Sequence, residues 1–386
     1  MDFNFSKQEK LLQGSVREYF RNKIVPVADE LDRKAPLTRR DALGFIENLV
    51  SFGYVGSLVP EAENGPGLSH VETGIIFLEL GKAWAALGAI AASTSHALTM
   101  ISKSKRVPGI KYAMDRLMSS KSLGCVAVTE PFAGTDLSAI KTTAIPEGDT
   151  YIINGTKTWV SNGSVADMVL VTVKMESAGN GNPYGILLVE KEASFFDTTE
   201  IPKMGLKGLS TARLFFDDCR VPGENLLQFD ENDSPAAELI LPHTSCEKTA
   251  LALGLTEAAL EAAVSYARKR VQFGSPLARF QMIQKMIAEM AIGLDAGKLL
   301  YFRSMKMLDE GLKCPKELAM ADSFASQTAV DATSKAIQIY GGYGYSDEYP
   351  VERFYRDAHC FSVMEGTKQI QQLKISQQIT GIDALV

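Results

Sequence analysis

A carboxylate, a glycine and a hydroxyl residue stand in a row near the end of the chain, as Glu365, Gly366 and Thr367. Apolar Phe361 and Met364 lie just before them. A glycine allows a sharp turn, and the free N–H groups at the start of a following helix then face the same side as the carboxylate and suit polar or anionic ligands. An apolar setting raises the pKa of a carboxyl group toward the range of a useful base. The stretch predicts a general base at Glu365, and the alternative is an acidic residue near the positive end of a helix.

The composition limits the class of partner. The 386 residues allow two or three domains or one composite unit, and 46% hydrophobic with 22% charged residues is typical of soluble globular proteins. A net charge of −6 argues against nucleic acid or an anionic membrane as the main partner. The first residues do not resemble a signal peptide, and we expect no apolar run long enough to span a bilayer. The stretch from Ala83 to Met100 is interrupted by polar residues and predicts a buried helix.

The cysteines and histidines do not have the spacing of a metal site. The five cysteines are odd in number, scattered and without a Cys-x-x-Cys pair, which predicts reduced thiols in a cytoplasmic protein. The four histidines, His70, His96, His243 and His359, also lack ligand spacing. We therefore expect no metal.

The elements that must position Glu365 follow the order helices, strands, helices. Capping-box patterns at residues 6–9 and 69–72 predict helix starts in the first third. Short apolar runs separated by turns then predict the strands of a small β domain, over 123–128, 150–153, 157–160, 168–174, 185–189 and 212–216. Their connections look too short for βαβ crossovers. Long helices follow, predicted over 244–271, 280–312, 315–340 and 350–363.

Separated stretches of the chain resemble the motifs of the acyl-CoA dehydrogenase family. They are Val128–Asp136, Asn154–Asn162, Asp217–Leu227, Arg270–Leu277 with Phe280–Gln281, Gln338–Gly344 and the Glu365 stretch. The resemblance covers essentially the whole chain in the order and spacing of the family. It implies a mainly α fold with a central β domain: an N-terminal helical domain (1–122), a small β-barrel or sandwich (123–235) and a C-terminal four-helix bundle (236–386).

The resemblance also implies an activity. Members bind FAD, usually form homotetramers and dehydrogenate an acyl thioester (EC 1.3), with electron-transfer flavoprotein or a similar acceptor as partner. A base removes the proton α to the thioester carbonyl while hydride leaves the β-carbon for flavin N5. Enolate charge is stabilised by a flavin ribityl hydroxyl and by the backbone N–H of the base. The thioester is an acyl-CoA or an acyl-carrier protein.

The motifs imply particular cofactor contacts. The flavin pyrimidine edge would meet Val128 and Thr129, Trp159 would pack on the ring, and the Ser161 hydroxyl would reach the central nitrogen. The full set expected to bind FAD is Val128, Thr129, Thr135, Trp159, Ser161, Arg270, Gln272, Phe273, Gln338, Gly341, Gly342, Thr367 and Gln369. The residues of this set at 270–273 would reach the FAD of a neighbouring subunit. The residues at 338–342 would let the backbone approach the ADP part of FAD closely. Out of this context, Trp159 fits a strand core, Arg270 a solvated helix end, and the two glycines a helix stop.

Glu365 occupies the family's usual base position. Some members carry the base on the long helix before the arginine motif, where Glu247 is a candidate. Glu247 lies one helical turn from Thr244, the position that aligns with that alternative base, so a helix-start charge is the preferred interpretation of Glu247. Glu130 and Asp136 are expected to hold their loop. Substrate contacts are expected from Thr135, His243, Ser245, Met364 and Gly366.

The chain departs from the family where coenzyme A is usually held. Pro242 and Ser245 stand at positions normally occupied by Asp and Arg, and Met364 replaces a frequent Tyr. The thioester handle could be a carrier-protein pantetheine or an unusual acyl-CoA, or Lys248 could supply the missing contact. The alternative function is a fold-sharing flavoprotein oxidase, monooxygenase or desulfinase, but a pure oxygenase needs no base at Glu365.

Overall fold

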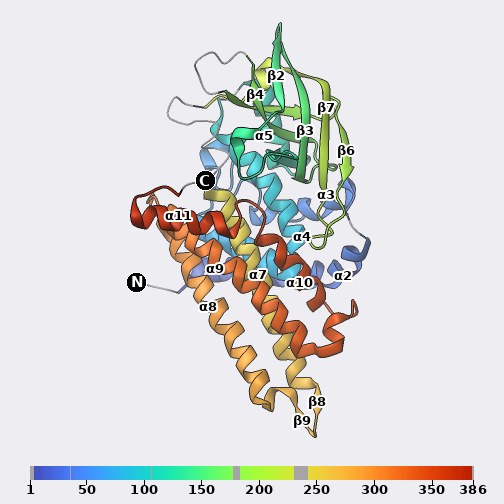
Figure 1. The fold of residues 1–386 in the computed structure, drawn as a ribbon, viewed down its shortest axis with the longest axis vertical. Coiled ribbons are helices and arrows are strands. Elements are labelled where there is room, and N and C mark those ends of the chain that lie inside the picture. The colour runs from blue at the N-terminus through green and yellow to red at the C-terminus, as the bar shows by residue number, and fades with distance from the viewer. Residues whose placement is uncertain (1–3, 35, 106, 177–182, 230–241, 385–386) are drawn as a thin grey trace.

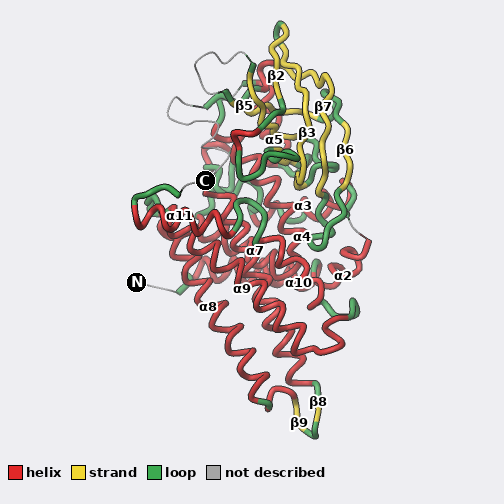
Figure 2. The backbone as a smooth tube through the Cα atoms, in the orientation of Figure 1, coloured by secondary structure: helices red, strands yellow, loops and turns green. Residues whose placement is uncertain are grey.

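The computed structural model describes residues 4–34, 36–105, 107–176, 183–229 and 242–384 (Figure 1). The expected order of helices, strands and helices is confirmed. Figure 2 shows the strands of the β domain gathered at one end of an elongated molecule, with helices filling the rest. The packed layers are therefore one sheet and a large helical body.

The N-terminal part contains α1 (Lys7–Lys23), α2 (Val25–Lys34), α3 (Arg39–Glu47), α4 (His70–Lys103) and α5 (Pro108–Met118). Both predicted capping boxes are present. The Ser6 hydroxyl accepts from the Glu9 N–H while the Glu9 carboxylate accepts from the Ser6 N–H, and Ser69 and Glu72 make the same reciprocal pair. These caps fix where α1 and α4 begin.

Two helices correct the expectation that no segment is long enough to span a bilayer. The helix α4 and the helical segment Ser245–Lys269 are long and apolar enough by length and composition. The polar residues of α4 interrupt the apolar run without ending the helix, because they find partners inside the fold, as Ser93 and Ser95 do. In α4, 94% of the apolar window is buried within the protein, which is typical of a core helix.

The β domain is one mixed sheet of β1 (Gly124–Ala127), β2 (Thr143–Glu147), β3 (Thr150–Ser161), β4 (Met168–Met175), β5 (Tyr184–Glu190), β6 (Asp197–Glu200) and β7 (Thr211–Pro222). The strand order is β1-β4-β2-β3-β7-β6, and β5 pairs with β4. Both β1 and β2 run parallel to β4, and the remaining pairs are antiparallel. The two strands expected over 150–160 are one long strand, β3, whose register against β7 shifts twice.

The C-terminal part contains α7 (Pro242–Lys269), a hairpin of β8 (Val271–Gln272) and β9 (Ser275–Pro276), α8 (Gln281–Asp309), α9 (Pro315–Tyr340), α10 (Val351–Phe361) and α11 (Lys368–Thr380). The helices α4 and α7 approach closely through glycines. A Cβ atom on Gly254 would lie 2.0 Å from the Leu78 carbonyl oxygen, and one on Gly81 would lie 2.3 Å from that of Leu251. This approach joins the N-terminal helices to the bundle and brings residues of α4 against residues of α7.

Candidate active site

The predicted turn and helix start around Glu365 are both present. Glu365 follows α10 with φ of 51°, Gly366 has φ of 88°, and the Thr367 hydroxyl caps α11 by accepting from the Ile370 N–H at 3.4 Å. A positive φ is unfavourable for a glutamate and persists only where surrounding contacts impose it. The backbone at Glu365 is therefore held in place by its neighbours.

A buried histidine lies between Glu365 and a second carboxylate. The Nδ1 atom of His96 is 3.4 Å from Glu365 Oε1, and its Nε2 atom is 2.6 Å from Glu247 Oε2. The Ser95 hydroxyl donates to the other oxygen of Glu247 at 2.8 Å. The side chain of His96 is 8% exposed, that of Glu247 7% and that of Glu365 26%, so only Glu365 opens to a ligand. Glu247 lies near the start of α7, as expected, and is there a buried neighbour of His96.

The charges of this group are coupled. Burial raises the pKa of Glu365, and the opposing effects of His96 and then Lys248 lower it. Burial by itself would lower the pKa of His96, but the carboxylates of Glu247 and Glu365 outweigh it and raise that pKa to about 9. These effects favour a protonated His96 at neutral pH.

Lys248 fixes the main chain on both sides of Glu365. Its Nζ atom is 2.8 Å from Asp322 Oδ2 and donates to the carbonyl oxygens of Met364 at 3.1 Å and Gly366 at 3.4 Å. Its side chain is buried and already has three partners, which disfavours the alternative that Lys248 contacts the thioester. The helices α7 and α9 together therefore position the Glu365 turn.

A second buried ion pair shapes the end of β1. Lys157 Nζ is 2.8 Å from Glu130 Oε1 and donates to the Val128 carbonyl oxygen at 2.9 Å. Glu130 also accepts from the N–H groups of Lys141 and Thr142, at 2.7 and 2.9 Å. The prediction that Glu130 holds its loop is confirmed, and the loop carries Val128 at its base.

Trp159 stands out from the sheet beside this loop. The N–H of Thr158 donates to the Thr129 carbonyl oxygen at 2.8 Å, so Trp159 lies next to the end of β1. Trp159 has φ of 58°, sits at a register shift of β3 and is 59% exposed. A strained backbone that presents a large indole to the outside contradicts the strand-core alternative. The ring is available to stack on a flat ligand.

The helix α4 brings the β3 side and the Glu365 side together. The Ser93 hydroxyl donates to the Ser161 carbonyl oxygen at 3.2 Å, and His96, three residues later, contacts Glu365. Residues three apart share one face of a helix and are separated by about 5 Å along its axis. The end of β3 and the candidate base therefore lie near one another along the same face of α4.

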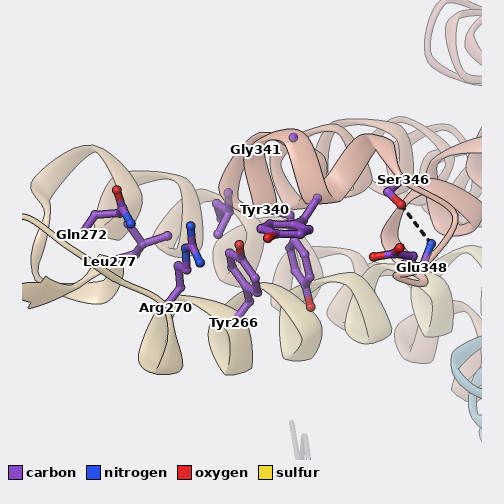
Figure 3. A pocket seen from close by; sticks show the side chains of 11 residues that line it. Tyr266, Arg270, Gln272, Leu277, Tyr340, Gly341, Ser346 and Glu348 are labelled. Atoms are coloured by element: carbon purple, nitrogen blue, oxygen red, sulfur yellow. Dashed lines mark hydrogen bonds between the residues drawn. The ribbon is translucent and has the colours of Figure 1, made fainter.

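A second group of predicted cofactor residues lies at the far end of the bundle. A cavity of about 590 Å³ is lined by residues that include Arg270, Gln272, Gly341 and Gly342 (Figure 3). Its floor holds a stacked pair of Tyr266 and Tyr340, with ring centroids 4.0 Å apart, and the Arg270 guanidinium lies 5.5 Å from the centre of the Tyr343 ring. Figure 1 shows the β8–β9 hairpin of this region at the end of the molecule opposite the sheet. Within one chain, this group is thus separate from Trp159 and Glu365.

Two features of this far end suit a ligand that approaches the backbone. Gly341 has φ of 62° and ψ of −137°, and a Cβ atom on Gly341 or Gly342 would meet nothing within 4 Å. Phe273, in the hairpin turn, has φ of 50° and is 94% exposed. The glycine backbone is open, and Phe273 projects away from its own chain.

The other predicted site residues are dispersed. Thr135, Gln338 and Gln369 are exposed, while Ser245 and Met364 are half-buried. The predicted substrate residue His243 begins α7 with Pro242 and Thr244, but the side chains of these three lie outside the part of the chain that the structure describes. Among the described residues there is no group of three or more His, Cys, Asp or Glu side chains that could hold a metal.

Models of three protein domains match the chain in succession. They are the N-terminal, middle and C-terminal domains of acyl-CoA dehydrogenases, at residues 6–104, 125–219 and 241–380. The chain belongs to the acyl-CoA dehydrogenase family. It is accordingly an FAD-dependent oxidoreductase that acts on CH–CH groups of acyl thioesters.

Individual acyl-CoA dehydrogenases match along their full length. Glutaryl-CoA dehydrogenase of Desulfococcus multivorans is 33% identical over 99% of each chain. An acyl-CoA dehydrogenase of Bacillus subtilis (strain 168) is 35% identical over 97% of this chain and 99% of its own. The structure of a glutaryl-CoA dehydrogenase complex with glutaryl-CoA superposes with a TM-score of 0.92 at 32% identity, covering 99% of this chain and 97% of that chain.

The described residues fit the FAD that the family requires. The exposed indole of Trp159 beside the Thr129 backbone suits one face and one edge of a flavin ring. The separate cavity, with its arginine, tyrosines and open glycine backbone, suits a nucleotide with phosphates and lies within the usual range of ligand pockets, about 300–1,000 Å³.

Proposed function

We propose that Glu365 is the base of this acyl-CoA dehydrogenase and that it removes the proton α to the thioester carbonyl. The observation that carries the proposal is the position of Glu365: it lies on the same face of α4 as the end of β3, in a strained turn that Lys248 and His96 contact. When bound there, FAD supplies a hydride acceptor for the β-carbon. A substrate between Trp159 and Glu365 would present its α C–H bond to Glu365 and its β C–H bond to the Trp159 side, where the flavin would lie, as the reaction requires.

Other groups of the chain stabilise the enolate, hold the flavin and contact the substrate. The backbone N–H of Glu365 donates to the thioester oxygen and stabilises the enolate charge that develops there. Val128, Thr129, Trp159 and Ser161 hold the flavin ring. The other assigned contacts are Thr135, Thr367 and Gln369 toward the cofactor, and Thr135, His243, Ser245, Met364 and Gly366 toward the substrate.

We infer that the ADP part of FAD is completed by a second copy of the chain. The supporting observation is the separation of the two groups of predicted residues within one chain, together with the projection of Phe273 from its hairpin. Arg270, Gln272, Phe273, Gln338, Gly341 and Gly342 would serve the FAD of a neighbour in a homotetramer. Light scattering of the yellow protein should give four chains with one FAD each. A monomer with full flavin content would contradict this assembly.

We also propose which group carries the acyl chain, which protein accepts the electrons and where in the cell the enzyme works. A carrier-bound pantetheine or an unusual acyl-CoA is favoured because Lys248 is occupied by Asp322 and the usual Asp and Arg positions hold Pro242 and Ser245. Electron-transfer flavoprotein, or a protein like it, would remove the electrons. Five free cysteines agree with a cytoplasmic location.

The experiment is anaerobic bleaching of the bound flavin by a panel of acyl thioesters, presented both as CoA esters and on an acyl-carrier protein. We expect at least one thioester to bleach the flavin of the wild type and not that of Glu365→Gln. Equal bleaching of both proteins would place the base elsewhere. Turnover of a thioester by oxygen insertion, with no dehydrogenated product, would support the fold-sharing oxygenase that retention of Glu365 disfavours.

A further inference from the structure

We propose that His96, fixed by Glu247, is a positioning residue that keeps the candidate base Glu365 ionised and correctly oriented for proton abstraction. The inference rests on the role proposed above for Glu365. It concerns a carboxylate–imidazole–carboxylate chain, defined here as Glu247, His96 and Glu365.

The geometry leaves the imidazole ring little freedom. Each ring nitrogen lies beside a carboxylate, Nε2 at 2.6 Å from Glu247 Oε2 and Nδ1 at 3.4 Å from Glu365 Oε1. Glu247 is itself held by the Ser95 hydroxyl, which comes from the same turn of α4 as His96. His96 and Glu247 come from α4 and α7, two helices that also pack closely against one another elsewhere along their length. A ring clamped in this way acts on Glu365 from a fixed direction.

The surrounding charges make His96 the cation that matters most for Glu365. From α7, Lys248 and Glu247 face this region; from α9, Asp322 does; and from α4, His96 does. Lys248 and Asp322 neutralise one another at 2.8 Å. Among the described residues, the largest electrostatic influence that favours the charged form of Glu365 comes from His96. Glu247 in turn keeps His96 protonated, with a pKa of about 9.

This arrangement has a defined part in the reaction. Before abstraction, the imidazolium offsets the penalty of burying the Glu365 carboxylate. During abstraction the α C–H bond breaks, its electron pair stays on the substrate carbon in conjugation with the carbonyl, and the proton forms an O–H bond on Glu365. His96 keeps both ring protons throughout, so it acts through Glu365 and not on the substrate.

The test reads the ionisation of Glu365 directly in the substrate-free holoenzyme. The carboxylic-acid C=O band in infrared difference spectra is titrated with pH and assigned by its loss in Glu365→Gln. We expect His96→Gln to raise the midpoint of this band by at least about one pH unit, a tenfold change in proton affinity. The double variant His96→Gln/Glu247→Gln should titrate below His96→Gln, because the repelling carboxylate is gone. The matched control is His359→Gln, which changes a histidine that packs edge to face against Tyr355 and should not move the midpoint.

An unchanged midpoint in His96→Gln would overturn the proposal, since a merely structural histidine changes flavin content or rates without moving this titration. A second measurement needs no His96 variant. The Cε1 resonance of His96 should titrate above pH 8 in the wild type and at lower pH in Glu247→Gln, and titration below pH 7 in the wild type would also overturn it. Neither readout requires turnover. If His96→Gln shifts the Glu365 midpoint but no thioester reduces the flavin, the proposed function is rejected and the role of His96 stands.

Discussion

Lys248 Nζ lies 2.8 Å from Asp322 Oδ2, and each of these side chains is 1% exposed. The same ammonium group donates to the carbonyl oxygens of Met364 and Gly366, the two neighbours of Glu365. A buried ion pair between α7 and α9 therefore also acts as a clamp on the turn that carries the candidate base. The stability of the bundle and the placement of Glu365 depend on the same two residues.

Replacing Lys248 by Met should destabilise the protein and displace the Glu365 turn. The change leaves the Asp322 carboxylate buried without its partner, which typically costs about 3–5 kcal/mol. Thermal melting followed by circular dichroism measures the first effect, and anaerobic flavin reduction measures the second. The double variant Lys248→Met/Asp322→Leu should recover much of the melting temperature but not the reduction rate. A single variant as stable as the wild type would contradict the prediction.

Glu365→Gln should abolish α-proton abstraction while FAD stays bound. Gln preserves size and polarity, so packing should survive, but it cannot accept the proton. We expect flavin reduction to fall by several orders of magnitude, beyond the ~10²–10⁴-fold typical of a general base, because hydride transfer depends on the same step. Anaerobic stopped-flow reduction of both proteins provides the measurement, and Glu310→Gln at the exposed end of α8 is the control. Comparable rates would show that Glu365 is not the base.

Arg270→Gln should lower the FAD content without unfolding the bundle. A lost hydrogen bond to a charged group typically costs about 1.5–3 kcal/mol, which corresponds to roughly 10–150-fold weaker binding. Arg268→Gln removes an exposed arginine from the same end of α7 and should leave the flavin content unchanged. The ratio of flavin to protein absorbance after gel filtration gives the result. Equal ratios for the two variants would exclude Arg270 from the cofactor site.

Asp357→Asn should stabilise the protein more at pH 8 than at pH 5. Burial, with a further contribution from Asp32, raises the pKa of Asp357 to about 7 against the opposing effects of Arg353 and Arg356. Because the folded carboxyl binds its proton more tightly than the unfolded one, its stabilising contribution is complete below about pH 4 and is lost as the pH rises through about 7.

Asn carries no such penalty and can still accept the Leu206 N–H, which Asp357 binds at 2.6 Å. Melting temperatures of both proteins at the two pH values are the check. A difference between wild type and variant that is the same at pH 5 and pH 8 would rule out titration of Asp357 as the cause.

The parts of the fold that follow local rules could be predicted from sequence. Capping boxes at Ser6 and Ser69 and a proline at the start of α9 act within a few residues, and each marked a real helix start. The polar strands β2 and β6 were missed because they lack an apolar run. The strand β3 was divided in two because Asn154 and Gly155 interrupt its apolar pattern, where its register against β7 first shifts.

His96 could not be assigned a role in advance, since its partners Glu247 and Glu365 come from distant segments of the chain. In the sequence it was one of several polar residues interrupting an apolar helix. The available signal was the polar run from Ser93 to His96 inside an apolar helix, because buried polar side chains require partners. Identifying those partners required the packing of α4 against α7 and the sheet.

The helix α9 sets the two groups of predicted site residues far apart. Asp322, which anchors the Glu365 turn, and Tyr340, which precedes the open glycines, are separated by roughly 27 Å along the helix axis. In the proposed assembly, each site takes its base from one chain and its arginine from another. A Glu365→Gln chain and an Arg270→Gln chain, each defective alone, would then form some wholly intact sites when co-expressed, so two defective genes could complement one another.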